Sequence, residues 1–230
     1  MKIHRIHSWD DISIADAKKL QIELASRIVL SSKLSDVKTI AAGDLAFSKN
    51  GVAYAAVIVL SYPDLQIMEN HAGFEKVRFP YVPGLLSFRE APLLLKLFEK
   101  LSIAPDIVMI DGQGIAHPRS FGIASHIGLF LKIPTIGIAK SRLIGEYAEP
   151  EKHKGSWSPL MHNGGQIGVV VRTRSNVTPV FASPGNMLDF ENCLKWTMNT
   201  TRRYRIPEPT RQAHIAVEIF KRDSEGCLHR

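Results

Sequence analysis

The sequence is poor in the features that mark secreted and membrane proteins. Its 230 residues include only two cysteines, Cys193 and Cys227, which are too few for a disulfide framework. The N-terminal stretch MKIHRIHSWDD lacks the apolar core of a signal peptide. No apolar run approaches the roughly 18–20 residues that span a bilayer. We therefore expect a cytoplasmic protein without a membrane partner.

Internal repeats, low-complexity tracts and long linkers are also missing from the chain. Hydrophobic residues make up 45% and charged residues 22% of the sequence, as is ordinary for a globular protein. A chain of this length can bury a substantial core in one α/β domain. We expect a single domain, residues 1–230, and a monomer.

The charge balance favours a nucleic-acid partner. Lys and Arg number 29 against 22 Asp and Glu, giving a net charge of +7, and a basic surface attracts polyanions. A local surplus lies near the C-terminus, which suggests a surface for the phosphate backbone or simply solvated helix charge. Its basic members are Lys195, Arg202, Arg203, Arg205, Arg211, Lys221 and Arg222, and its acidic members are Glu208 and Glu218.

Hydrophobic periodicity predicts an α/β fold with a mixed sheet. A helix from Ser13 to Val29 is followed by three strands whose turn signals indicate an antiparallel meander: Thr39–Phe47, Val52–Leu60 and Leu65–Val77. Alternating helices and short apolar strands then predict parallel βαβ units flanked by helices. These are the helices Ser87–Leu101, Phe121–Leu131, Leu188–Met198 and Pro209–Lys221 and the strands Ile107–Ile110, Thr135–Ile138, Gln166–Thr173 and Pro179–Ala182.

Three carboxylates stand at positions where charge is costly or where sites form. Asp44 lies inside an apolar strand, Asp111 follows the Ile107 strand, and Glu90 is expected in the first turn of the Ser87 helix. If the two strands are neighbours, Asp44 faces Asp111 and Glu90 can reach both. An all-oxygen set suits Mg²⁺ or Mn²⁺ and argues against zinc.

Each carboxylate also has a structural interpretation. Asp44 can be a strand-end residue, Glu90 a helix N-terminal acid favoured by the dipole, and Asp111 a cap for the next turn.

The loop after Asp111 has the composition of a ligand-binding loop. Gly112 and Gly114 allow close backbone approach, while His117 and Arg119 offer hydrogen-bond donors for a phosphate or a base. A dinucleotide-binding fingerprint needs glycine where His117 stands, and a P-loop needs glycine where Ala139 precedes Lys140. We therefore expect no nucleotide cofactor.

A second loop is stiffened by Pro80 and Pro83, which hold Tyr81 in one place before Gly84. Proteins that open duplexes insert such rigid groups between bases, although a proline-braced surface loop is the plainer interpretation. Lys140 follows a strand end and His214 lies on a helix face. Both are candidates for contacts near a phosphate or a metal ligand, and both can be structural.

Several motifs together resemble the endonuclease V family. They are Gly43-Asp44, Pro80-Tyr81-Val82-Pro83-Gly84, Phe88-Arg89-Glu90, Asp111-Gly112-Gln113-Gly114, His117-Pro118-Arg119 and Gly137-Ile138-Ala139-Lys140-Ser141. The likeness runs from about Ser13 to Lys221 and is strongest from Phe79 to Leu143. It departs in Asp44-Leu45-Ala46-Phe47, where the family often has Asp-Val-Ser-Tyr, and this bears only on strand packing.

The resemblance implies a ribonuclease H-like fold and a Mg²⁺-dependent enzyme acting on DNA that contains deoxyinosine. It implies nicking at the second phosphodiester bond 3′ to the lesion, with a 5′-phosphate product. Asp44, Asp111 and Glu90 would bind the metal, Lys140 and His214 would assist, and Tyr81 would be the wedge. A base pocket would involve Pro80, Pro83, Gly84, Leu86, Gly112, Gly114, His117 and Arg119. Two alternatives remain: a related nuclease for structured or inosine-containing RNA, and a non-catalytic nucleic-acid-binding module.

Overall fold

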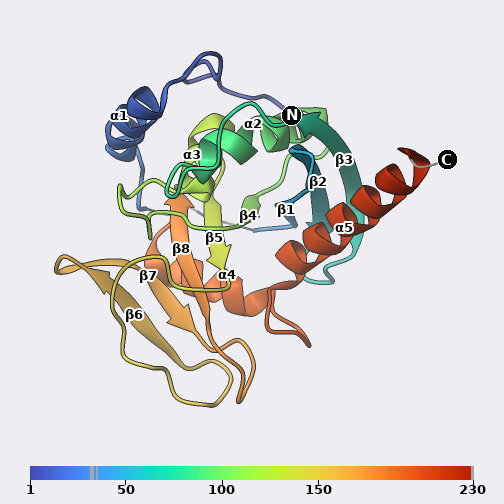
Figure 1. The fold of residues 1–230 in the computed structure, drawn as a ribbon. Coiled ribbons are helices and arrows are strands. Elements are labelled where there is room, and N and C mark those ends of the chain that lie inside the picture. The colour runs from blue at the N-terminus through green and yellow to red at the C-terminus, as the bar shows by residue number, and fades with distance from the viewer. Residues whose placement is uncertain (32–33, 35, 229–230) are drawn as a thin grey trace.

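A mixed sheet forms the centre of the protein in a computed structural model that describes residues 1–31, 34 and 36–228. Within these residues the sheet has eight strands in the order β3-β2-β1-β4-β5-β8-β7-β6 (Figure 1). The arrangement is ribonuclease H-like, as expected, with helices on both faces of the sheet. The strands are β1 (Thr39–Phe47), β2 (Val52–Ser61), β3 (Ile67–Lys76), β4 (Ile107–Asp111), β5 (Thr135–Ala139), β6 (Trp157–His162), β7 (Gly165–Val171) and β8 (Val180–Asn186).

The predicted meander is confirmed. β1 pairs antiparallel with β2, and β2 pairs antiparallel with β3. The turn between β1 and β2 contains Gly51, whose φ of +75° suits the left-handed region. β1 also pairs in parallel with β4, and β4 pairs in parallel with β5, so the predicted βαβ unit is confirmed as well.

The strand β6 was not predicted. It pairs antiparallel with β7 at the edge of the sheet, and it contains Pro159. A proline has no amide hydrogen for a strand ladder, so it is tolerated mainly on edge strands and weakens any strand prediction. The β6–β7 hairpin extends away from the rest of the molecule at the lower left of Figure 1.

Five helices pack around the sheet in the described part of the chain. They are α1 (Ile14–Ala25), α2 (Leu86–Lys100), α3 (Ile123–Leu131), α4 (Phe190–Asn199) and α5 (Glu208–Leu228). The first ends at Ala25, whereas Val29 was expected. After it, the amides of Ser26, Arg27 and Ile28 bond to carbonyls three residues back, so the apolar spacing continues through tight turns outside the α-helix. The last helix runs beyond the predicted end at Lys221.

Two apolar layers fill the two faces of the sheet. On β1, Ala41 packs toward α2 and α3, while Ile40 and Ala42 pack toward α4 and α5. Because side chains alternate along a strand, Asp44 lies on the α4/α5 face. Val108 and Met109 divide between the layers in the same way on β4, so Asp111 shares the face of Asp44.

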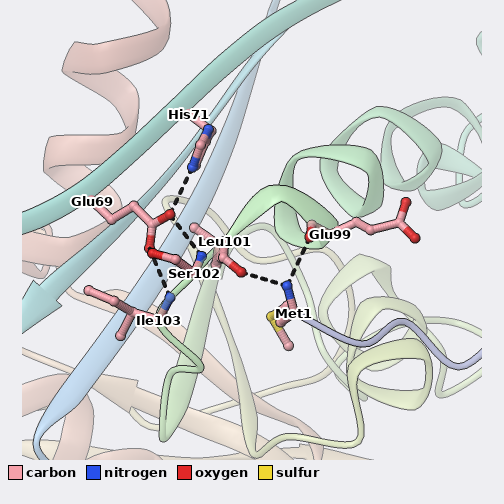
Figure 2. Close-up of polar contacts among 7 residues, drawn as sticks. All are labelled: Met1, Glu69, His71, Glu99, Leu101, Ser102 and Ile103. Carbon is pink, nitrogen blue, oxygen red and sulfur yellow. Dashed lines mark hydrogen bonds and ion pairs between the residues drawn. The ribbon is translucent and has the colours of Figure 1, made fainter.

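The C-terminal end of α2 is held by a polar network shown in Figure 2. The Glu69 carboxylate on β3 accepts hydrogen bonds from the amides of Ser102 and Ile103 at 2.9 and 3.0 Å. It also pairs with His71 at 2.8 Å. Partial burial opposes ionisation of Glu69, but the bonds from Ser102, His71 and Ile103 outweigh it and lower its pKa to about 2.

The N-terminal ammonium group of Met1 donates to the carbonyls of Glu99 and Leu101 at the same helix end (Figure 2). These carbonyls have no partner within the helix, so the bonds complete its C-terminal turn. No helix among the described residues combines the length and hydrophobicity that crossing a membrane requires.

Candidate active site

Asp111 is the last residue of β4, and Asp44 lies in β1 just past the point where the parallel pairing of the two strands ends. Gly43 of β1 pairs with Ile110 of β4, so the two aspartates are the next residues along the two strands. Asp44 is 7% exposed. Its Oδ2 contacts Nδ1 of His214 on α5 at 2.8 Å, and its Oδ1 accepts from the amide of Leu45 at 2.8 Å.

Asp111 is paired with a lysine from the neighbouring strand end. Lys140 Nζ lies 2.5 Å from Asp111 Oδ2, and it follows β5, which pairs in parallel with β4. The lysine side chain is about half exposed, at 48%. The structure therefore brings four predicted site residues, Asp44, Asp111, Lys140 and His214, to one edge of the sheet.

Glu90 reaches the same edge from α2. The helix begins at Leu86, so Glu90 stands in its second turn and the expected first-turn position was wrong. A Cβ on Gly43 would lie only 2.9 Å from Leu94, which shows how closely α2 approaches β1 beside Asp44. Glu90 precedes Leu94 by one helical turn, and this spacing brings its carboxylate toward the strand ends.

Two of the three carboxylates, Asp44 and Glu90, have raised pKa values. Burial, followed by the charges of Asp44 and Asp111, raises the pKa of Glu90 to about 8. Burial and then the charge of Asp111 also raise the pKa of Asp44, although the hydrogen bond from His214 opposes this shift. Helix-dipole stabilisation, the structural alternative for Glu90, does not fit an acid with a raised pKa.

A divalent cation fits this donor set. Within the described residues, no group of three or more His, Cys, Asp or Glu side chains already has the spacing of a metal site. Two of the carboxylates contact the protein donors Lys140 and His214, while none of the described side chains donates a hydrogen bond to Glu90. Three acids close together, one of them buried and without a hydrogen-bond donor among the described side chains, have the chemistry of a hard-cation site.

The proline-braced loop presents Tyr81 to solvent. Tyr81 is 71% exposed, between Pro80 and Pro83. The loop is held by bonds to the carbonyls at its two ends: Arg89 donates to Phe79, while His117 and Arg119 both donate to Gly84. It is therefore a fixed platform with an exposed aromatic ring.

His117 and Arg119 direct their donors inward rather than toward solvent. His117 Nε2 lies 3.0 Å and Arg119 Nη2 2.6 Å from the Gly84 carbonyl. Burial, and then the charge of Arg119, lower the pKa of His117 to about 4, so its imidazole is neutral at pH 7. Both residues therefore contact the loop from Pro80 to Gly84, called the tyrosine loop below. The sequence had suggested that their side chains donate to a phosphate or a base.

The loop after Asp111 is packed tightly against β5 and β8. A Cβ on Gly114 would lie 2.1 Å from the Pro184 carbonyl oxygen, and the Gly114 amide donates to Ser183 Oγ at 2.8 Å. Gly112 has a φ of +143°. A Cβ on Gly137 of β5 would lie 2.3 Å from the Gly114 amide, so glycine is needed on both sides of the contact. Leu86, at the start of α2, is 38% exposed.

Several residues around the site were missed or differently interpreted in the sequence. Arg205 was counted with the basic surface, but its guanidinium donates to the carbonyls of Lys140 and Pro179 at 2.6 and 2.7 Å. Arg211 forms an ion pair with Glu208. Part of the basic surplus therefore stabilises the protein's own chain.

Gln21 and Ser183 also contact the loops, and neither gave a sequence signal because each is a single polar residue in an ordinary helix or strand.

Comparison with known proteins identifies a family. A family model described as Endonuclease V matches residues 22–215. An endonuclease V from Petrotoga mobilis is 45% identical over 221 residues, which cover 96% of this chain and 99% of the relative. One from Dehalococcoides mccartyi is 47% identical over 217 residues, covering 94% and 97%.

Solved structures agree with the sequence comparisons. The crystal structure of an endonuclease V from Bacillus subtilis has a TM-score of 0.94 at 31% identity, covering 98% of this chain and 99% of the other. A Ciona intestinalis endonuclease V, in complex with a 24mer DNA containing an inosine followed by a ribo-adenosine, has a TM-score of 0.80 at 25% identity. The alignment covers 91% of this chain and 98% of the Ciona chain.

Proposed function

This chain belongs to the endonuclease V family, and from that premise we propose that it is a metal-dependent endonuclease acting on inosine in DNA. The cut falls at the second phosphodiester bond 3′ to the lesion and leaves a 5′-phosphate and a 3′-hydroxyl. The protein acts as a monomer, through one domain formed by residues 1–230. The observation that carries the proposal is that Asp44 and Asp111 follow the last paired residues of the adjacent strands β1 and β4, beside the buried Glu90.

Asp44, Asp111 and Glu90 would hold Mg²⁺, with Mn²⁺ as a substitute. The bound ion supplies an activated water molecule and neutralises charge on the phosphate in the transition state. His214 orients Asp44 through its 2.8 Å contact. Lys140 keeps a positive charge at Asp111, where the scissile phosphate would bring further negative charge.

The lesion would be recognised at the two loops next to this edge. Tyr81 projects from its rigid loop and would fill the space left by a displaced base, as inserted side chains do when a nucleotide leaves the stack. The base would lie near Gly84, Leu86, Gly112, Gly114 and His117. Support comes from the fixed geometry of both loops and from the Ciona relative, whose structure contains inosine DNA.

The direct test is incubation with oligonucleotides that carry a single inosine. Duplex DNA, single-stranded DNA and RNA are compared in Mg²⁺, in Mn²⁺ and in EDTA, with adenine at the same position as the control. We expect metal-dependent nicking only of the strands that contain inosine, at the second phosphodiester bond 3′ to the lesion. Faster cutting of inosine RNA than DNA would favour the RNA alternative.

Asp44→Ala separates a nuclease from a binding module. We expect this variant to lose nicking while retaining measurable affinity for the inosine duplex, because Tyr81 and the loops remain. Full cutting by Asp44→Ala would contradict the proposed site. Tight inosine binding by the wild-type protein without nicking in either metal would instead support the non-catalytic alternative.

A further inference from the structure

We propose that Gln21 on α1 is a positioning residue for lesion recognition and that it acts through Arg119 on the carbonyl of Gly84. These three residues are called the Gln21 relay below. The inference rests on the proposed function, because it assigns a role in the recognition of inosine to a helix that lies apart from the catalytic edge (Figure 1).

Both ends of the Gln21 amide are used. The residue is 1% exposed. Its Oε1 accepts from Arg119 Nε at 2.5 Å, and its Nε2 donates to the Phe121 carbonyl at 3.0 Å. A guanidinium only donates and a carbonyl only accepts, so these partners fix the orientation of the amide. Gln21 therefore places the Arg119 guanidinium in one position.

Arg119 passes this constraint to the tyrosine loop. Its Nη2 donates to the Gly84 carbonyl at 2.6 Å, and the same oxygen accepts from His117. Gly84 has a φ of +76°, and a Cβ there would lie 2.8 Å from Arg119 Nη2. The guanidinium thus occupies the side of Gly84 that a side chain would fill.

Along the chain, Gly84 lies between Tyr81, the proposed wedge, and Leu86, one of the residues proposed to surround the base. Tyr81 precedes Gly84 by three residues, and Leu86 follows it by two. Within the same loop, the Leu85 amide donates to the Val82 carbonyl at 2.9 Å, which closes the loop into a turn. A shift of Gly84 would therefore move the wedge and the pocket together.

The apolar side of α1 supports the same loop. Ala17, one turn before Gln21, packs in a buried cluster with Leu85 and Phe88, and Phe79 and Val82 pack against this cluster. Leu24, on the other side of Gln21, packs with Phe121. One face of α1 thus contacts the tyrosine loop through apolar side chains and, between them, through the Gln21 relay.

A pair of substitutions isolates the relay from simple structural loss. Gln21→Met and Gln21→Glu both lose the bond to the Phe121 carbonyl, but only Gln21→Met loses the acceptor for Arg119. Single-turnover cleavage of a deoxyinosine duplex gives two quantities: the maximal rate, and the enzyme concentration at half the maximal rate. Gln166→Met, on β7, is the control glutamine and should leave both unchanged.

We expect Gln21→Met to raise the half-maximal concentration by about 5- to 20-fold, as loss of a hydrogen bond to a charged group permits, with the maximal rate within about twofold of wild type. Gln21→Glu should stay within about twofold of wild type in both quantities. Arg119→Met should match Gln21→Met, and adding Gln21→Met to it should cause no further increase. If Gln21→Met does not fold, Arg119→Met, at a partly exposed position, carries the same measurement.

Other outcomes overturn the inference. Equal losses in Gln21→Met and Gln21→Glu, an unchanged half-maximal concentration, or multiplicative effects with Arg119→Met would each show that Gln21 does not act through Arg119. Hydrogen exchange at the Leu85 amide gives a readout that does not depend on activity, and faster exchange in Gln21→Met alone supports the relay. If wild-type protein does not cut inosine DNA, the proposed function fails, and the exchange measurement still decides whether the relay positions the loop.

Discussion

Replacing Glu90 by glutamine should stabilise the metal-free protein while removing its activity. Glu90 is 7% exposed, and its pKa rises from 4.5 to about 8. A carboxyl whose folded pKa is raised stabilises the fold fully below pH 4.5, and that contribution is lost as the pH rises toward 8. At about 1.36 kcal/mol for each pH unit between 4.5 and 7, keeping Glu90 protonated in the folded protein costs roughly 3 kcal/mol at pH 7, because the same carboxyl ionises freely in the unfolded chain. Glutamine carries no charge and avoids this cost.

The assay is thermal unfolding in EDTA between pH 5 and pH 8. A gain of roughly 3 kcal/mol in a protein of this size corresponds to a Tm increase of about 6–12 °C at pH 7. The gain should be smaller at pH 5, because pH 5 lies close to the ordinary pKa of 4.5 in the unfolded chain, so keeping the folded carboxyl protonated costs little there. Glu99→Gln, at an exposed position on the same helix, is the control and should show no such gain.

Adding Mg²⁺ should make the wild-type protein more stable to heat than Glu90→Gln, the reverse of their order in EDTA. A ligand that binds only the folded state raises its stability, and wild-type protein with three carboxylates should gain more from Mg²⁺ than Glu90→Gln. A Glu90→Gln protein that is less stable than wild type in EDTA across this pH range would refute the electrostatic reasoning about the site.

Three other perturbations test separate parts of the structure. Glu69→Gln should flatten the loss of stability that wild type shows in acid unfolding as the pH falls from 4.5 toward 2, because the pKa of Glu69 is lowered to about 2. Gly114→Ala should lower the Tm and weaken binding of the inosine duplex, since its Cβ would lie 2.1 Å from the Pro184 carbonyl oxygen; unchanged binding would argue against a pocket there. Tyr81→Ala should reduce the preference for inosine over adenine, measured by competition binding, more than the single-turnover rate; equal losses on every substrate would argue against a wedge.

The parts of the fold that the sequence predicted are those with one strong physical signal. Apolar runs marked the buried strands β1 and β2. Turn residues located β3 as well, because Asn50-Gly51 and Pro63 separate the three strands. The carboxylates were found for a related reason: Asp44 places a charge inside an otherwise apolar strand, and Asp111 places one at the end of another. The edge strand β6 escaped because Pro159 hides its pattern.

Sequence reasoning did not find contacts that depend on tertiary structure. Gln21 looks like any polar helix residue until α1 is placed against Phe121 and Arg119. Gly137 belongs to a recognised motif, but its need for glycine arises from the Gly114 amide packed on it. The bonds of His117 and Arg119 to the Gly84 carbonyl were not predicted for the same reason: local sequence does not say which carbonyl a donor will meet.

The carboxylate site and the tyrosine loop differ in how far their polar groups are already paired before substrate binds. At the edge, Asp44 and Glu90 have raised pKa values, and Glu90 receives no hydrogen bond from any described side chain. At the loop, the Gly84 carbonyl already accepts two hydrogen bonds. A cation would therefore change the electrostatics of cleavage far more than the shape of the recognition surface. It follows that wild-type protein in EDTA should still prefer an inosine duplex over an adenine duplex in competition binding. Loss of that preference on metal removal would show that the ion also organises the loops.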